Sequence, residues 1–187
     1  AGLQHAGQPP DRVVWLDAHG DFHTWASTQT QYIGGMPLAM FVGRVDDGID
    51  PRSQAALACL STIGVQAYPQ RQIVLADARD LDPGEHEALL GSEILRCRLG
   101  DVMEHLRPQE RIYLHWDTDI IDDRARMPAL KYHVERGPSA ADMGAFFQAL
   151  RSFDVVAVSV SAWHEEQDGD NQTARACLQI LNTLLDA

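Results

Sequence analysis

The sequence predicts an α/β fold in which helices cover both faces of a mainly parallel sheet. Four apolar runs have the length and composition of buried strands, at Arg12–Leu16, Gln72–Ala76, Arg111–Trp116 and Asp154–Val160. The segments between them carry helical patterning, and strands that alternate with helices are typical of parallel sheets. No intervening loop is long enough to be a domain linker, so we expect residues 1–187 to form a single domain.

Several other segments of the chain are weaker in pattern. Residues 1–10 resemble the end of a helix and a loop that enters the first strand. A shorter strand is expected near Glu93–Arg98, followed by a helix at Gly100–Leu106. Loops rich in Gly, Pro and Asp are expected at Asp46–Pro51, Asp80–Glu85 and Gln167–Asn171. Because the chain starts with Ala and soon enters a strand that leads to the candidate site, we expect further sequence upstream.

Two helices are predicted near the C-terminus. Ser139 with an acid three residues later is an N-cap signal, and it begins a helix. One stripe of this helix is apolar and belongs to the core, with Met143, Phe146, Phe147 and Leu150. The last segment, Thr173–Leu185, has a similar stripe and is expected to close the sheet.

The composition argues against some classes of binding partner. The chain is 45% hydrophobic and 22% charged, which is typical of a soluble globular domain. Its formal net charge of -12 argues against nucleic acid or an anionic membrane as a partner and favours a cation. No apolar run approaches the ~20 residues that span a bilayer, and no signal pattern is present, so we expect a cytoplasmic location. The cysteines, Cys59, Cys97 and Cys177, are interpreted as buried apolar residues.

Acidic and imidazole side chains occur in two clusters, each directly after an apolar run. The first is Asp17-Ala18-His19-Gly20-Asp21 and the second is Asp117-Thr118-Asp119. If the strands continue through them, alternate side chains project to one face, at the strand ends where α/β sheets bind ligands. Several acids held together there need a cation, and Asp with His suits a divalent metal such as manganese. The alternative is a polar turn with a helix cap.

Such clusters predict a two-metal hydrolytic site. Two divalent ions about 3.5–4 Å apart can deprotonate a water held between them, and the hydroxide attacks an electron-poor carbon. Asp17 and Asp117 hold equivalent first positions and are the expected bridging ligands. His19, Asp21 and Asp119 would complete the two coordination spheres.

Four blocks in order resemble the arginase (ureohydrolase) family: Val14–Asp21, Gly35–Ala39, Ala78–Glu85 and Asp117–Asp122. The resemblance implies a three-layer α/β/α fold with two Mn²⁺ ions, a linear guanidine or amidine as substrate, and a homo-oligomer.

By position in these blocks, Asp17 and Asp117 resemble the bridging ligands, Asp21 a ligand of one manganese, and His19 with Asp119 ligands of the other. Asp21 and Asp117 would take their catalytic part through the metal-bound hydroxide. The family's sixth ligand is a histidine in an upstream Gly-Gly-Asp-His block that this sequence does not contain. Either the chain is truncated at its N-terminus or one metal lacks a ligand.

The resemblance also implies substrate contacts. Asp82 and Glu85 resemble acids that recognise the α-amino end of arginine, although Asp-Pro-Gly-Glu is equally a capped turn that starts a helix. His23 stands where arginases carry a substrate-contacting asparagine, and Thr30 lies near a matched serine. His23 as a simple loop residue remains the alternative.

The sequence departs from the family at important positions. Gly34 replaces a histidine that shuttles protons, Ala162 replaces the guanidinium-binding glutamate, and Ser159 replaces a usual acid. Glu165 or Glu166 could supply a displaced carboxylate.

Three functions therefore stay open. The first is a dimanganese hydrolase that cleaves a C–N bond of a linear guanidine or amidine. The second is a noncatalytic, metal-binding or regulatory member of the same fold. The third is a zinc amidohydrolase of the deacetylase type, whose His-His pair is not visible in the sequence.

Overall fold

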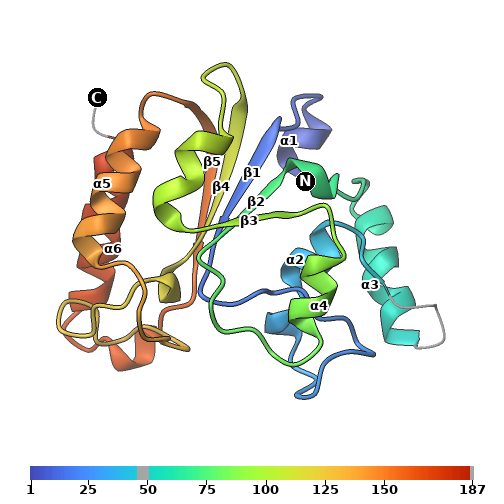
Figure 1. Ribbon diagram of the computed structural model, residues 1–187, viewed down its shortest axis with the longest axis horizontal. Helices are drawn as coiled ribbons and strands as arrows, with labels where there is room; N and C mark the ends of the chain where they lie inside the picture. The colour runs from blue at the N-terminus through green and yellow to red at the C-terminus, as the bar shows by residue number, and fades with distance from the viewer. Residues whose placement is uncertain (46–50, 186–187) are drawn as a thin grey trace.

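An all-parallel, five-stranded sheet lies at the centre of the computed structural model, which describes residues 1–45 and 51–185 (Figure 1). The strand order is β3-β2-β1-β4-β5. The strands are β1 (Arg12–Leu16), β2 (Ile73–Ala76), β3 (Leu95–Cys97), β4 (Arg111–Asp117) and β5 (Asp154–Ser161). The prediction of a mainly parallel sheet is confirmed, and each expected strand lies within two residues of its predicted ends.

The register of the central strands brings their carboxyl ends to the same edge of the sheet. Leu16, the last residue of β1, pairs with Trp116 of β4. Asp17 and Asp117 therefore follow paired residues on neighbouring strands. In Figure 1 the loops that follow these strands lie at the lower end of the view.

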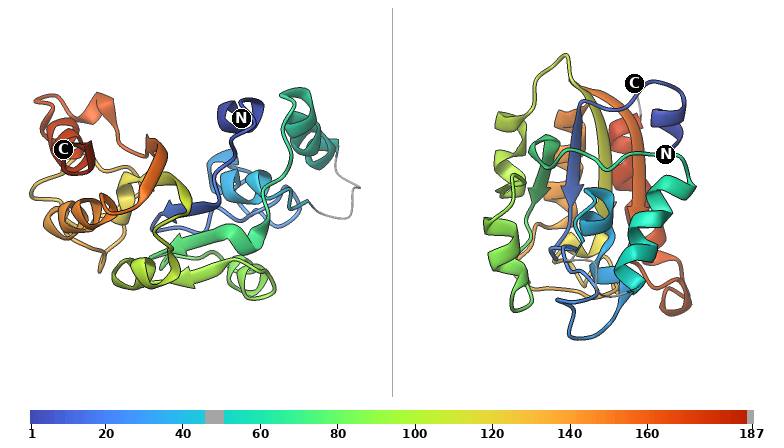
Figure 2. Two further views of the ribbon diagram at one scale, coloured as in Figure 1. Left: turned by 90° about the horizontal axis from the view of Figure 1, so that it is seen from above. Right: turned by 90° about the vertical axis from the view of Figure 1, so that its right-hand side faces the viewer.

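Alternate residues of each strand face two separate layers of helices. Val14 and Leu16 belong to one hydrophobic core, and Val13 and Trp15 belong to the other. The first core is covered by α5 (Ala140–Leu150), α6 (Gln172–Leu185) and a 3-10 helix at Leu99–His105. The second is covered by α2 (Pro37–Phe41) and α4 (Glu85–Leu90). Figures 1 and 2 show α5 and α6 on one side of the sheet and α2 and α3 on the other.

The two C-terminal helices match the prediction closely. At the start of α5, Ser139 Oγ accepts a hydrogen bond from the Asp142 backbone N–H at 3.2 Å, and Asp142 Oδ2 accepts one from the Ser139 N–H at 2.9 Å. The predicted stripe of α5 is buried. α6 begins one residue earlier than expected, and the Asp168 carboxylate accepts hydrogen bonds from its first turn, including the Thr173 N–H at 2.9 Å.

Other local predictions need correction. The helix expected at Gly100–Leu106 is a 3-10 helix, Leu99–His105, in a short segment that contains a glycine. The helix end expected within residues 1–10 is present as α1 (Gly2–His5), whereas α2 and the longer α3 (Pro51–Thr62) had no predicted bounds. Of the expected loop Asp46–Pro51, residues 46–50 lie outside the described residues, and Pro51 begins α3.

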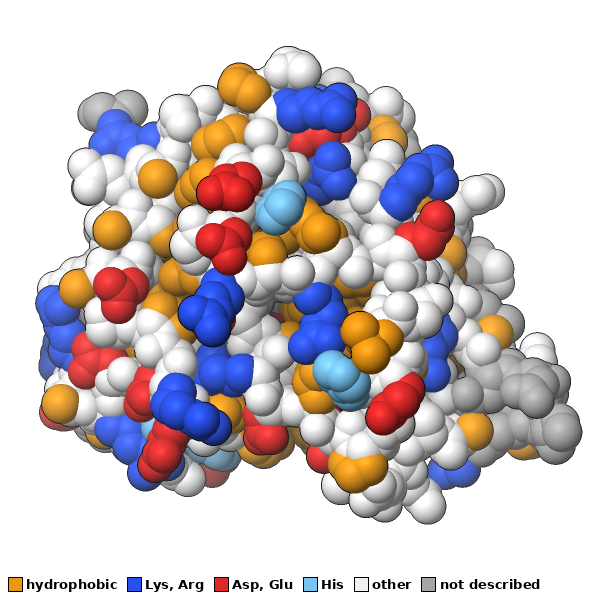
Figure 3. Space-filling view, in the orientation of Figure 1, with side chains coloured by type: hydrophobic (Ala, Val, Ile, Leu, Met, Phe, Trp, Pro, Cys, Tyr) orange, Lys and Arg blue, Asp and Glu red, His pale blue; other side chains and the backbone are white. Residues whose placement is uncertain are grey.

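The three cysteines differ in burial. Cys177 is buried as expected, whereas Cys97 is half-buried and Cys59 is exposed, and all three are free thiols. No helix among residues 1–45 and 51–185 has the length and apolar character needed to cross a membrane. Figure 3 shows basic and acidic side chains intermixed on one face, so the acidic excess is not concentrated there.

Candidate metal centre

The first acidic cluster lies in a loop rather than in a strand. β1 ends at Leu16, and Asp21 adopts a positive φ of 50°. Projection of alternate strand residues is therefore the wrong reason for the convergence of these side chains. The chain instead turns back on itself, and Asp17 anchors the turn. Asp17 Oδ1 accepts a hydrogen bond from the His19 backbone N–H at 2.8 Å, and its Oδ2 accepts one from Trp15 Nε1 at 3.2 Å.

The second cluster begins at the last residue of β4 and continues into a 3-10 helix, Thr118–Ile120. Thr118 Oγ1 donates to the Ser161 carbonyl at 2.9 Å, which ties this turn to the end of β5. The Arg79 guanidinium holds the next residues, because its Nη2 donates to the Ile120 carbonyl at 3.0 Å and to the Val134 carbonyl at 2.8 Å. The position of Asp119 is therefore fixed from both sides.

The five predicted metal ligands form two overlapping triplets. In each triplet the ligand atoms lie within 4.8 Å of one another. The triplets are Asp17, His19 and Asp119, and Asp17, Asp21 and Asp117. Asp17 belongs to both triplets, as a bridging ligand must, whereas Asp117 belongs to one. Asp17 is 0% exposed and Asp119 is 1% exposed, so the cluster is deeply buried.

Burial and mutual repulsion give the cluster unusual acid–base properties. Burial, then the neighbouring charges of Asp17 and Asp119, raise the pKa of Asp117 to about 9. Burial also raises the pKa of Asp21 and Asp119. For His19 burial acts to lower the pKa, but hydrogen bonds to Asp119 and Asp17 outweigh it and raise the pKa to about 11. Without a cation, the cluster therefore retains protons at neutral pH.

Two buried oxygen atoms test whether the site suits a metal. Asp117 Oδ1 and Asp119 Oδ1 are buried and have no hydrogen-bond partner among the described residues. A buried carboxylate oxygen without a partner is costly, and a cation would satisfy it. Carboxylate oxygens with one imidazole suit a divalent ion such as manganese or zinc. The residues present therefore fit the metal that the sequence predicts.

A cavity of about 570 Å³ opens over the cluster. The sequence-predicted site residues that line it are His19, Asp21, His23, Thr30, Asp82, Glu85, Asp117 and Asp119. The proposed substrate contacts, from the segments that follow β1 and β2, therefore reach the same space as the candidate metal ligands. Two of these residues are paired, since His23 Nε2 lies 3.2 Å from Asp82 Oδ2.

Glu85 has a structural role in addition to its place in the cavity wall. Its Oε1 accepts a hydrogen bond from the Phe22 N–H at 2.8 Å, and its Oε2 accepts one from the Asp82 N–H at 3.3 Å. A Cβ atom at Gly20 would lie 2.5 Å from the Glu85 carboxyl carbon, so only glycine fits beside it. Glu85 thus joins the loop after β1 to the start of α4, and its carboxylate is buried rather than solvated.

The family departures have visible consequences in the cavity. A Cβ at Gly34 would lie 2.2 Å from Cε1 of the Tyr32 ring, so Tyr32 fills the space beside Gly34. Ala162 lines the cavity with a positive φ of 66°. Glu165 and Glu166 are exposed in a 3-10 helix and are not among the described lining residues, so the expectation of a displaced carboxylate there is not supported.

Sequence reasoning missed part of the cavity wall. His115 lines it and packs against Trp15 with ring centroids 3.8 Å apart, and its Nδ1 lies 2.7 Å from Ser159 Oγ. Burial lowers the pKa of His115 to about 4, so its ring is neutral at neutral pH. Lys131 and Tyr132 also line the cavity. The sequence did mark Lys131 as unusual, because it is the only lysine in the chain.

Comparison with known proteins gives consistent matches along the chain. A model of the arginase family matches residues 1–186. The N(omega)-hydroxy-L-arginine amidinohydrolase of Streptomyces lavendulae is 27% identical over 190 residues, which cover 97% of this chain and 63% of that protein. Human arginase-1 is 31% identical over 137 residues, which cover 63% of this chain and 39% of that protein.

Solved structures show the same fold. The arginase of Bacillus cereus superposes with a TM-score of 0.77 at 23% identity, over 94% of this chain and 62% of that one. The arginase of Entamoeba histolytica in complex with L-ornithine gives a TM-score of 0.76 at 22% identity, over 97% of this chain and 62% of that one. This chain thus spans less than two thirds of the length of these relatives.

Proposed function

Because the chain belongs to the arginase family, we propose that it carries the dimetal centre of a hydrolase that cleaves a C–N bond of a linear guanidino or amidino compound. The convergence of the two ligand triplets at the base of one cavity carries this proposal. A cluster of this kind is expensive to bury and fits a cation. A cavity above it gives a substrate access to that cation.

We infer that the metal is manganese, with two ions per site. Asp17 would be shared, His19 and Asp119 would hold one ion, and Asp21 and Asp117 the other. The unpaired Oδ1 of Asp117 supports a further bridging contact by that residue. When bound, the ions supply the Lewis acidity that makes a water nucleophilic at neutral pH.

The remaining steps belong to side chains of this chain. The reactive group of the substrate lies over the cluster, and its remote end lies toward the outer wall, where Asp82, His23 and Thr30 can contact it. Asp21 accepts the proton of the attacking water and passes it to the departing nitrogen, which leaves as an amine.

A noncatalytic role is the second candidate, and one observation favours it. The cavity wall has glycine at position 34 and alanine at position 162, and both positions lack the side chains that the family uses for proton shuttling and guanidinium binding. Such a protein would bind metal for stability or regulation without turnover.

Metal content together with turnover separates these candidates. The protein is dialysed, loaded with Mn²⁺ and analysed for bound metal, and urea or amine release is followed with L-arginine, N-hydroxyarginine, agmatine and guanidino acids. Two manganese per chain with turnover of one of these supports the hydrolase. Two manganese without turnover across the panel favours the noncatalytic role, and failure to bind metal overturns both.

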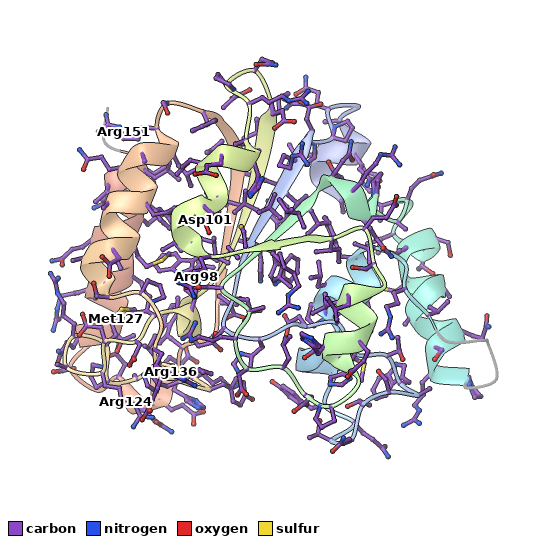
Figure 4. The ribbon with its side chains drawn as sticks, viewed as in Figure 1. Arg98, Asp101, Arg124, Met127, Arg136 and Arg151 are labelled. Atoms are coloured by element: carbon purple, nitrogen blue, oxygen red, sulfur yellow. The ribbon has the colours of Figure 1, made fainter. Side chains whose placement is uncertain are left out.

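Paired variants test the assigned ligands. Asp119→Asn should abolish tight manganese binding by one triplet and remove activity. Asp101→Asn is the matched control, because Asp101 is an exposed acid of the 3-10 helix beside the sheet, as Figure 4 shows. Unchanged manganese binding in the Asp119→Asn variant would show that Asp119 is not a ligand.

A further inference from the structure

The only lysine of the chain faces the cavity over the metal cluster. All the other basic residues among the 15 Lys and Arg of the sequence are arginine. Lys131 is held by its backbone, since its N–H donates to the Ala162 carbonyl at 3.0 Å and the preceding Leu130 bridges to Trp163. The next residue, Tyr132, has a positive φ of 56°. This backbone path places Lys131 and Tyr132 together in the cavity wall.

Two tyrosine hydroxyls accompany the lysine ammonium. The Tyr132 hydroxyl donates to the Tyr32 hydroxyl at 3.0 Å, which joins the loop before α2 to the loop before α5. Lys131 Nζ lies 5.0 Å from the centre of the Tyr132 ring. Because the Tyr132 proton is used in the pair, the Tyr32 proton can be donated to a ligand. The group therefore offers an ammonium and a phenol proton side by side.

Nothing else in the described part of the chain neutralises this ammonium. No carboxylate among the described residues forms an ion pair with Lys131. Yet the described cavity wall is otherwise acidic, and Lys131 is its one lysine or arginine. The acids that share the wall are Asp21, Asp80, Asp82, Glu85, Asp117 and Asp119. An ammonium in the outer wall of an acid-rich cavity is well placed to select an anionic group, and to separate it from the acids.

The depth of these residues indicates which end of a substrate they meet. Asp17 and Asp119 are 0% and 1% exposed at the base of the site, whereas Tyr32 and Tyr132 are 47% and 51% exposed. Tyr132 nevertheless lies close to the cluster, because its ring centre is 6.4 Å from that of His19. A substrate with its reacting carbon over the cluster would extend its remote end past these tyrosines.

We propose that Lys131 and the Tyr32 hydroxyl bind a carboxylate at the remote end of the substrate, so that the site prefers guanidino or amidino acids over the corresponding amines. This inference rests on the proposed function for its substrate class. Carboxylate recognition by an ammonium has the larger effect when no carboxylate of the protein already pairs with that ammonium. A hydrogen bond between charged groups of this kind corresponds to about a tenfold to hundredfold difference in affinity.

Two ligand pairs isolate the carboxylate. L-Ornithine and 1,4-diaminobutane differ only in that group, as do L-arginine and agmatine. Calorimetric binding of the first pair to the manganese-loaded protein needs no turnover, so it tests this inference even if hydrolysis fails. We expect the wild-type protein to bind L-ornithine about tenfold or more tightly than the diamine. Equal affinities, or no binding of L-ornithine, would overturn the assignment.

Substitutions assign the effect to the lysine. Lys131→Met should remove most of the preference for L-ornithine and for L-arginine, and leave diamine and agmatine parameters nearly unchanged. Lys131→Arg should keep part of it. Arg124→Met is the matched control, because Arg124 is an exposed cation of the same loop that lies at the outer edge of the molecule in Figure 4. The inference is wrong if the control loses the same preference, or if Lys131→Met weakens both ligands of a pair equally.

Chemical labelling offers a check on the wild-type protein. An amine-selective acylating reagent should modify Lys131, and mass spectrometry of the peptide that contains it reports the extent. L-Ornithine should slow this modification several-fold, and 1,4-diaminobutane should not. Equal protection by both ligands would contradict carboxylate binding at this side chain.

Discussion

Raising the pH should destabilise the metal-free protein, because the metal centre keeps protons that the unfolded chain releases. The pKa of Asp117 is raised by burial to about 9, and that of His19 is raised by its carboxylate partners to about 11. In an unfolded chain these groups titrate near ~3.9 and ~6.5. A group with a higher pKa in the folded state stabilises fully below its unfolded pKa, and this contribution is lost as pH rises through its folded pKa.

The size of the effect follows from the number of protons that the folded protein keeps and the unfolded chain releases. Between pH 6.5 and 8.5, the folded protein keeps the Asp117 proton and the unfolded chain does not. One proton over this range corresponds to about 3 kcal/mol of unfolding free energy. Of the groups described here, His115 acts in the opposite direction, because burial lowers its pKa to about 4. Its contribution to stability changes mainly below pH 6.5, so it adds little over the range considered. His19 adds to the loss.

Urea unfolding followed by circular dichroism measures this dependence. In the presence of a chelator, the free energy of unfolding should fall by about 3 kcal/mol or more from pH 6.5 to 8.5. With manganese the fall should disappear, because metal binding releases the protons and tightens as pH rises. Asp117→Asn is the matched variant and should have a shallower slope without metal. A flat or rising stability in the chelated wild-type protein would refute the reasoning.

Three further substitutions test the frame of the site. Gly137→Ala puts a Cβ 2.4 Å from Arg79 Nη2 and from the Ile120 carbonyl oxygen. We expect it to lower the free energy of unfolding in urea by about 1–3 kcal/mol and to weaken manganese binding in a metal titration. Unchanged values would contradict the close packing. Ser139→Ala removes the N-cap of α5 and should cost about 1 kcal/mol, with a lower Tm than wild type. Phe147→Ala empties a fully buried position and should cost about 3–5 kcal/mol, and a loss below 1 kcal/mol would show that the core refills.

Elements with strong local signals could be predicted from the sequence. The helix α5 combines a cap at Ser139 with an apolar stripe, and both signals lie within eleven residues of one another. The strand at Arg12–Leu16 is a continuous apolar run, which is typical of a strand that is buried on both faces. The 3-10 helix at Leu99–His105 has no such pattern, and its type depends on packing against the sheet.

The residues of the candidate site were predicted better than their arrangement in space. The identity of its ligands could be read from two short clusters, yet the convergence of Asp17 and Asp21 depends on a turn with a positive φ that strand alternation does not describe. Lys131 and Tyr132 could not be placed, because their position depends on the path of a long loop and on its bridge to Trp163. Contacts of this kind join residues far apart in sequence and leave no local period.

The place of Asp17 in both ligand triplets means that the two metal positions of the proposed centre would not be independent. An ion at either position draws on the same carboxylate, so occupancy of one alters the affinity of the other by an equal factor in both directions. The two manganese ions are therefore expected to bind with distinct, linked constants. Partial loading would then populate singly and doubly occupied molecules in proportions that depend on this linkage as well as on the affinity of each position.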